Sequence, residues 1–111
     1  MDNFTGRVAV VTGASLGLGR SLAWKCAELG MKVVLVSSHR ERIEQAAREL
    51  RAAFPAVDAL PVQADVSQPA EMEALAQTTW DAFGGAHLVI NNAGVLLLGS
   101  PLDNTIDEWH W

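Results

Sequence analysis

The stretch Thr12-Gly13-Ala14-Ser15-Leu16-Gly17-Leu18-Gly19 decides how the chain folds, because it joins two segments of different periodicity. It follows an apolar, valine-rich run at residues 7–11 that is too short for a helix and favours a buried strand. It precedes apolar residues at intervals of three and four over residues 18–29, which predict a helix. We therefore expect a strand, a glycine-rich turn and a helix in immediate succession.

Each glycine of this turn has an expected physical role. Gly13 is expected to adopt backbone angles closed to other residues, Gly17 to let a ligand approach the main chain, and Gly19 to let the helix pack closely on the strand. The first turn of a helix leaves N–H groups unpaired, and the helix dipole adds positive potential there. The turn, with Ser15 and the amides near Gly17 and Leu18, is therefore a predicted site for a diphosphate.

The alternation of strands and helices continues along the chain. Strands that alternate with helices pair in parallel through right-handed crossovers. The predicted fold is α/β, a Rossmann-type doubly wound parallel sheet with strand order 3-2-1-4, in which the fourth strand is left as an unpaired edge. Further strands are expected at residues 32–36, 59–64 and 87–91, further helices at 38–54 and 67–83, and another helix from Thr105.

The helix ends and faces give finer expectations. Ser38 with Glu41 three residues later has the pattern of a capping box, and Ser67 shortly before a proline has the pattern of a helix start. Leu18 and Leu29 are expected to belong to the buried stripe of the first helix.

Composition and charge limit the classes of function. The chain has 111 residues, of which 50% are hydrophobic and 19% charged, and its formal net charge is −5. This composition favours a single globular domain, and the acidic balance argues against general binding to nucleic acid or to an anionic membrane surface. No membrane span or secretory signal is visible, so the expected location is cytoplasmic. Cys26, the single cysteine, is expected to be a packing residue.

A second motif, Asn91-Asn92-Ala93-Gly94, comes directly after the predicted fourth strand. Together with the pattern Thr-Gly-x-x-x-Gly-x-Gly at Thr12 to Gly19, it resembles the short-chain dehydrogenase/reductase family. The resemblance covers essentially the whole chain, and implies that residues 1–111 are the N-terminal, NAD(P)-binding portion of a longer single-domain oxidoreductase. Both motifs are predicted at the carboxyl ends of strands, where ligands bind in open parallel sheets.

The resemblance also implies roles for residues at these strand ends. The backbone around Asn92, Ala93 and Gly94 is expected to line the cofactor ribose. Asp65 is expected to accept a hydrogen bond from the exocyclic amine of adenine, and the Val66 amide to donate to the ring. An aspartate just before a helix is equally well explained as a turn or cap former, so its type alone does not separate these readings.

The preference between NADP and NAD depends on the residues at the end of the second strand, because an acidic residue there would repel a 2′-phosphate. This chain has no acid in Ser37-Ser38-His39-Arg40, which favours NADP while leaving NAD as the second candidate. Relatives that prefer NADP often carry a basic residue at the positions of Leu16 or Ser38. Ser38, His39 and Arg40 are expected to contact the cofactor here. His39 or Arg40 is expected to supply the charge instead, unless both are ordinary solvent-facing residues.

The catalytic residues that the resemblance implies are a serine, an asparagine and a Tyr-x-x-x-Lys pair. The sequence contains no tyrosine, and its lysines are Lys25 and Lys32, both early in the chain. We therefore expect these 111 residues to be inactive alone, while the parent protein reduces carbonyls or oxidises secondary alcohols. The family is commonly oligomeric, so the resemblance also suggests a homo-oligomer. The alternative hypothesis is a nucleotide-binding sensor or regulatory module without catalysis.

Overall fold

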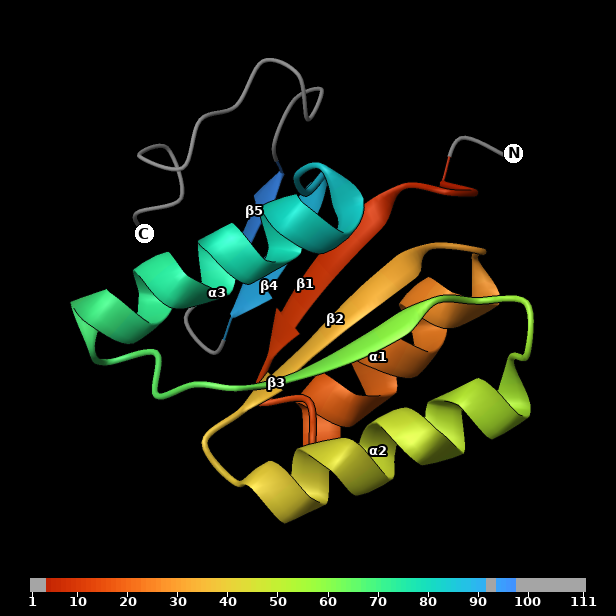
Figure 1. Ribbon diagram of the computed structural model, residues 1–111. Coiled ribbons are helices and arrows are strands. Elements are labelled where there is room, and N and C mark those ends of the chain that lie inside the picture. The colour runs from red at the N-terminus through yellow and green to blue at the C-terminus, as the bar shows by residue number, and fades with distance from the viewer. Residues whose placement is uncertain (1–3, 92–93, 98–111) are drawn as a thin grey trace.

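The computed structural model describes residues 4–91 and 94–97, which fold into one sheet flanked by helices on both faces (Figure 1). The elements are β1 (Val8–Thr12), α1 (Gly17–Glu28), β2 (Lys32–Ser37), α2 (Arg40–Ala53), β3 (Ala59–Gln63), α3 (Pro69–Phe83), β4 (Leu88–Asn91) and β5 (Gly94–Leu97). Four strands are parallel in the order β3-β2-β1-β4, as predicted, and β5 pairs with β4 in the antiparallel direction. The helix expected from Thr105 lies outside the described residues.

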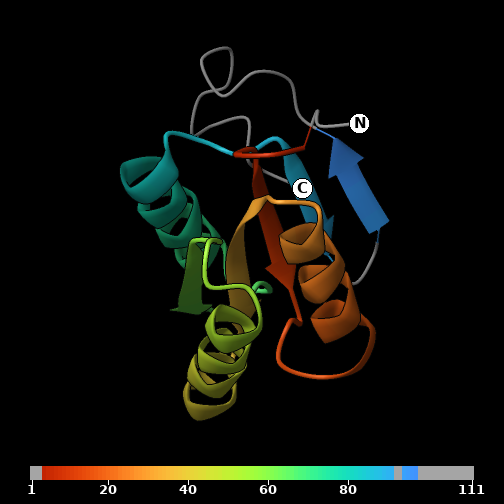
Figure 2. The same ribbon diagram turned by 90° about the vertical axis from the view of Figure 1, so that its right-hand side faces the viewer.

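The central strands are apolar because both faces of the sheet are covered. Helices α1 and α2 lie on one face and α3 on the other, as the two views in Figures 1 and 2 show. Along β1, Ala9 and Val11 point into the cluster formed with α1 and α2, while Val8 and Val10 point into the cluster formed with α3. The alternation of side chains along each strand thus feeds two separate cores.

The buried face of α1 differs from the prediction. Leu18 and Leu29, expected to be buried, are 75% and 40% exposed, and α1 packs through Ala23, Cys26 and Ala27. These side chains are small, so α1 can lie close to the sheet. Within the described part of the chain, no helix is both long and apolar enough to cross a bilayer.

The edges of the sheet differ from the prediction on one side. The expectation that the fourth strand is an unpaired edge is wrong, because β5 pairs with β4 in the antiparallel direction. At the opposite edge β3 lies beside β2, with Pro61 in register with Leu35. Proline is tolerated there because an edge strand has one side that needs no hydrogen-bond donors.

Two side chains tie β1 to β4. The Thr12 hydroxyl, which is buried, donates to the Ile90 carbonyl at 3.4 Å at the carboxyl ends of the strands. At the other ends, the Val8 amide donates to His87 Nδ1 at 3.0 Å, and the His87 amide donates to the Val8 carbonyl at 2.8 Å. Burial, with the positive charge of Arg7 nearby, lowers the pKa of His87 below its usual value of 6.5.

We expect this histidine to make folding stability depend on pH. Folding lowers the pKa of His87, so this residue makes its full contribution to the free energy of unfolding above about pH 6.5. The contribution is lost as the pH falls below that value. The variant His87→Asn retains an acceptor oxygen but does not titrate. Urea unfolding should be measured from about pH 5 to about pH 8, the range in which histidine titrates. The free energy of unfolding should fall less at low pH for this variant than for the wild type. Identical pH profiles would contradict the assignment.

Candidate functional site

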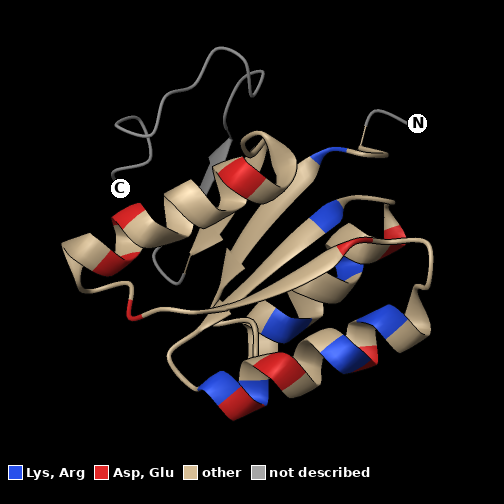
Figure 3. Cartoon of the chain, in the orientation of Figure 1, with Lys and Arg blue, Asp and Glu red and all other residues tan. Residues whose placement is uncertain are grey.

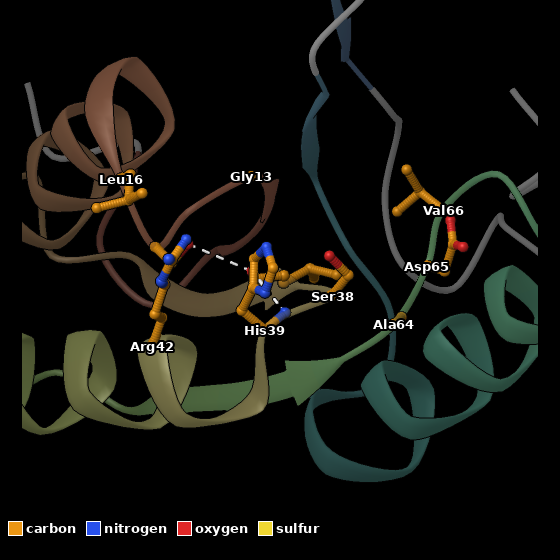
Figure 4. Close-up of a pocket in the computed structure, with 11 residues that line it drawn as sticks. Gly13, Leu16, Ser38, His39, Arg42, Ala64, Asp65 and Val66 are labelled. Atoms are coloured by element: carbon orange, nitrogen blue, oxygen red, sulfur yellow. Dashed lines mark hydrogen bonds between the residues drawn. The ribbon is translucent and has the colours of Figure 1, made fainter.

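The carboxyl ends of β1, β2 and β3 open onto a cleft of about 350 Å³ (Figure 4). Parallel strands end at the same edge of a sheet, which is why segments far apart in the sequence meet here. Six of the predicted binding residues line the cleft, namely Gly13, Ser15, Ser38, His39, Asp65 and Val66. The other lining residues are Leu16, Val36, Ser37, Arg42 and Ala64.

The glycine loop forms one wall and exposes the start of α1. Gly13 and Gly17 have positive φ angles of 63° and 58°, a region that glycine enters without strain. A Cβ atom on Gly17 would meet no atom within 4 Å, so the space beside this residue is open. Leu16 occupies the N-cap position without a side-chain acceptor, and the first turn of α1 carries no acidic residue. An anion with several oxygen atoms fits this arrangement, since the first amides of α1 have no acceptor within the helix.

Gly19 explains why α1 begins where it does. A Cβ atom at this position would overlap the Gly13 carbonyl group, lying 2.6 Å from its carbon and 3.1 Å from the Thr12 oxygen. The loop is held from the other side by the Ala14 amide, which donates to the Val36 carbonyl of β2 at 3.0 Å. The start of α1 is therefore fixed against both β1 and β2.

The end of β2 forms the middle of the cleft. Ser37 is buried, and its hydroxyl accepts a hydrogen bond from the His39 amide at 3.1 Å and lies 3.3 Å from the Ser15 hydroxyl. The expectation that Ser38 caps α2 is wrong: the N-cap residue is His39, and no side chain caps this helix. The strand continues through Ser37, so Ser38 lies in the turn and lines the cleft.

Asp65 and Val66 form the far wall, after β3. The Asp65 carboxylate accepts hydrogen bonds from the Ser67 amide and hydroxyl at 3.0 and 2.6 Å, and these bonds lower its pKa below the usual value. Asp65 therefore stabilises a turn, which is one of the two roles predicted for it. Ser67 is not a helix cap, because α3 begins at Pro69 after Gln68. Both bonds use Asp65 Oδ1, and Val66 is 39% exposed, so a carboxylate oxygen and an apolar surface remain available for a ring.

Other predicted site residues do not line this cleft. Gly17, Leu18 and Gly19 form the adjacent first turn of α1. Arg40 lies outside the cleft, and its Nε is 3.4 Å from Glu44 Oε2 on the exposed face of α2. Gly94 begins β5, while Asn92 and Ala93 lie outside the described residues.

Sequence reasoning missed Leu16, Ser37 and above all Arg42 as lining residues. Arg42 belongs to a helix face rich in charged residues, which is typical of a solvated surface. The only signal in the sequence was its place shortly after the end of β2, in the first turn of α2.

Comparisons with known proteins agree with this geometry. A family model described as short chain dehydrogenase matches residues 7–110. A short-chain type dehydrogenase/reductase from Picea abies is 44% identical over 109 residues, which cover 93% of this chain and 40% of that protein. A crystal structure of a short-chain dehydrogenase/reductase from Burkholderia phymatum in complex with NAD has a TM-score of 0.74 and 43% identity, covering 80% of this chain and 31% of that one.

L-sorbose reductase from Gluconobacter frateurii, complexed with NADPH and L-sorbose, has a TM-score of 0.79 and 35% identity, covering 98% of this chain and 41% of that one. The chain therefore spans less than half the length of these proteins.

The packing of the glycine loop predicts a difference between two alanine substitutions. Gly19→Ala places a methyl group against main-chain atoms that cannot move independently, and should lower the free energy of unfolding by about 3 kcal/mol. Gly17→Ala meets open space and should cost about 1 kcal/mol, through its positive φ alone. Urea unfolding followed by circular dichroism measures both. Equal losses would show that the contact at Gly19 is not a constraint.

Proposed function

This chain belongs to the short-chain dehydrogenase/reductase family, and we propose that it forms the cofactor-binding half of an NAD(P)-dependent oxidoreductase that interconverts carbonyls and secondary alcohols. The observation that carries this proposal is the start of α1, which has no capping side chain and borders open space at Gly17. The cleft beside it continues past the ends of β2 and β3. A long ligand with a central diphosphate suits this combination.

The proposal assigns a part of the cofactor to each wall. The amides of Gly17 and Leu18 would hold the diphosphate. Asp65 and Val66 would hold the adenine, through the free carboxylate oxygen and the exposed apolar side chain. The segment around Gly94 would line the nicotinamide ribose. When bound, the cofactor supplies or accepts a hydride; the residues of this chain orient it.

We propose NADP as the preferred cofactor. The end of β2 carries the neutral Ser37, whose hydroxyl is engaged with the His39 amide and the Ser15 hydroxyl. A carboxylate at this position would accept hydrogen bonds from the ribose hydroxyls and repel a 2′-phosphate. Its absence removes that repulsion, so NADPH is expected to bind more tightly than NADH, and equal affinities would contradict this preference.

Two substitutions at Gly17 test the diphosphate site. Asparagine and aspartate have nearly the same shape and both tolerate positive φ, but only aspartate adds a negative charge. We expect Gly17→Asp to bind NADPH more weakly than Gly17→Asn by on the order of tenfold. Fluorescence titration measures the affinity, and circular dichroism verifies that both variants fold. Wild-type chain that binds neither NADPH nor NADH would refute the proposed function.

We also expect the 111-residue chain to bind its cofactor without turning over substrate. Proton transfer in the family is assigned to a tyrosine, and this sequence has none. The measurement is NADPH oxidation by the purified chain with a panel of ketones. Turnover comparable to that of a complete enzyme would contradict this expectation.

A further inference from the structure

We propose that Arg42 determines the preference for NADP by binding the 2′-phosphate. This inference rests on the proposed function, because it names a further contact in the same cofactor site. The sequence predicted that His39 or Arg40 supplies the positive charge, whereas this inference assigns it to Arg42. Leu16 and Ser38 occupy the positions where NADP-preferring relatives often carry a basic residue, so the phosphate needs a cation from elsewhere.

The two arginines at the start of α2 differ in their surroundings. Figure 3 shows positive and negative residues interleaved along this helix. Arg40 lies on the exposed face near Glu44. Arg42 lines the cleft and makes no ion pair with any other residue that the structure describes. Its guanidinium charge is therefore available to a ligand.

The position of Arg42 along the cleft matches the chemistry of the cofactor. Figure 4 places Arg42 and Leu16 at one end, Ser38 and His39 in the middle, and Asp65 with Val66 at the other end. If adenine occupies the end at Asp65, the adenosine ribose lies beside Ser38. A phosphate on this ribose then faces the end that holds Arg42. The length of the cleft thus separates the cationic end from the end that carries the carboxylate.

The acidic side chains described near Arg42 do not form an ion pair with it. Arg42 also borders a second hollow of about 500 Å³ between α1 and α2, which Glu41 and Glu49 line as well. Glu49 is paired with Arg20 at 2.7 Å and accepts a further hydrogen bond from Gln45, so its charge is already compensated. Glu41 does not line the cofactor cleft. An arginine in this setting can offer its planar fork of donors to a phosphate.

The test is a titration of wild type, Arg42→Gln, Arg42→Lys and the matched control Arg40→Gln with NADPH and with NADH. We expect Arg42→Gln to weaken NADPH binding by about tenfold or more, while NADH binding changes by less than about twofold. Arg42→Lys should retain part of the NADPH affinity, because it keeps the charge but not the fork. Arg40→Gln should leave both affinities unchanged.

Two results would overturn the inference while leaving the proposed function intact. One is cofactor binding by all variants with the same ratio of NADPH to NADH affinity as the wild type. The other is a larger selective loss in Arg40→Gln than in Arg42→Gln. Failure of the wild type to bind either cofactor would instead refute the proposed function, and this inference with it. Titration with 2′,5′-ADP and 5′-AMP isolates the phosphate: only the former should be sensitive to Arg42→Gln.

Discussion

Gly19 and the Gly13 carbonyl lie so close together that no side chain fits between them, and this contact fixes the start of α1 at the end of β1. The Ala14 amide anchors the same loop to β2 through the Val36 carbonyl. A helix held in this way directs its first amides to one edge of the sheet. The rest of the site lies along that edge, since β2 and β3 end beside it.

The proposed site would bind an anion in an acidic chain. The formal net charge is −5, yet the proposal needs only main-chain amides and one guanidinium, which has no ion pair among the described residues, to favour a phosphorylated ligand. Partial charges at a helix start act over a few ångströms, whereas the net charge is spread over the surface and screened by salt. Local geometry therefore outweighs the overall balance, and the exposed pair of Arg20 with Glu49 removes a competing charge from the vicinity.

Features set by strong local patterns could be predicted from the sequence. The valine-rich runs indicated parallel strands, and the glycine spacing indicated the loop, because backbone conformation depends directly on residue type there. Weaker local patterns, such as a serine before a helix, gave wrong predictions. Ser38 and Ser67 are residue types that commonly cap helices, but the N-cap residues of α2 and α3 are His39 and Gln68. Ser38 follows directly after β2, and Ser67 is hydrogen-bonded in the Asp65 turn. The pairing of β5 with β4 also lacked a local signal, since it depends on which edge is free.

The sequence by itself determined the order of the parallel strands with the helices between them, and many of the residues at their carboxyl ends, since periodicity and glycine placement specify a parallel sheet and its open edge. Only the tertiary structure decided which cation lines the cleft. Arg40 and Arg42 are the same residue type two positions apart on one helix, and side chains at that spacing point in different directions. The packing of Ile43 and Ala46 against the sheet sets the rotation of α2 about its axis, and in this orientation Arg42 lines the cleft whereas Arg40 does not.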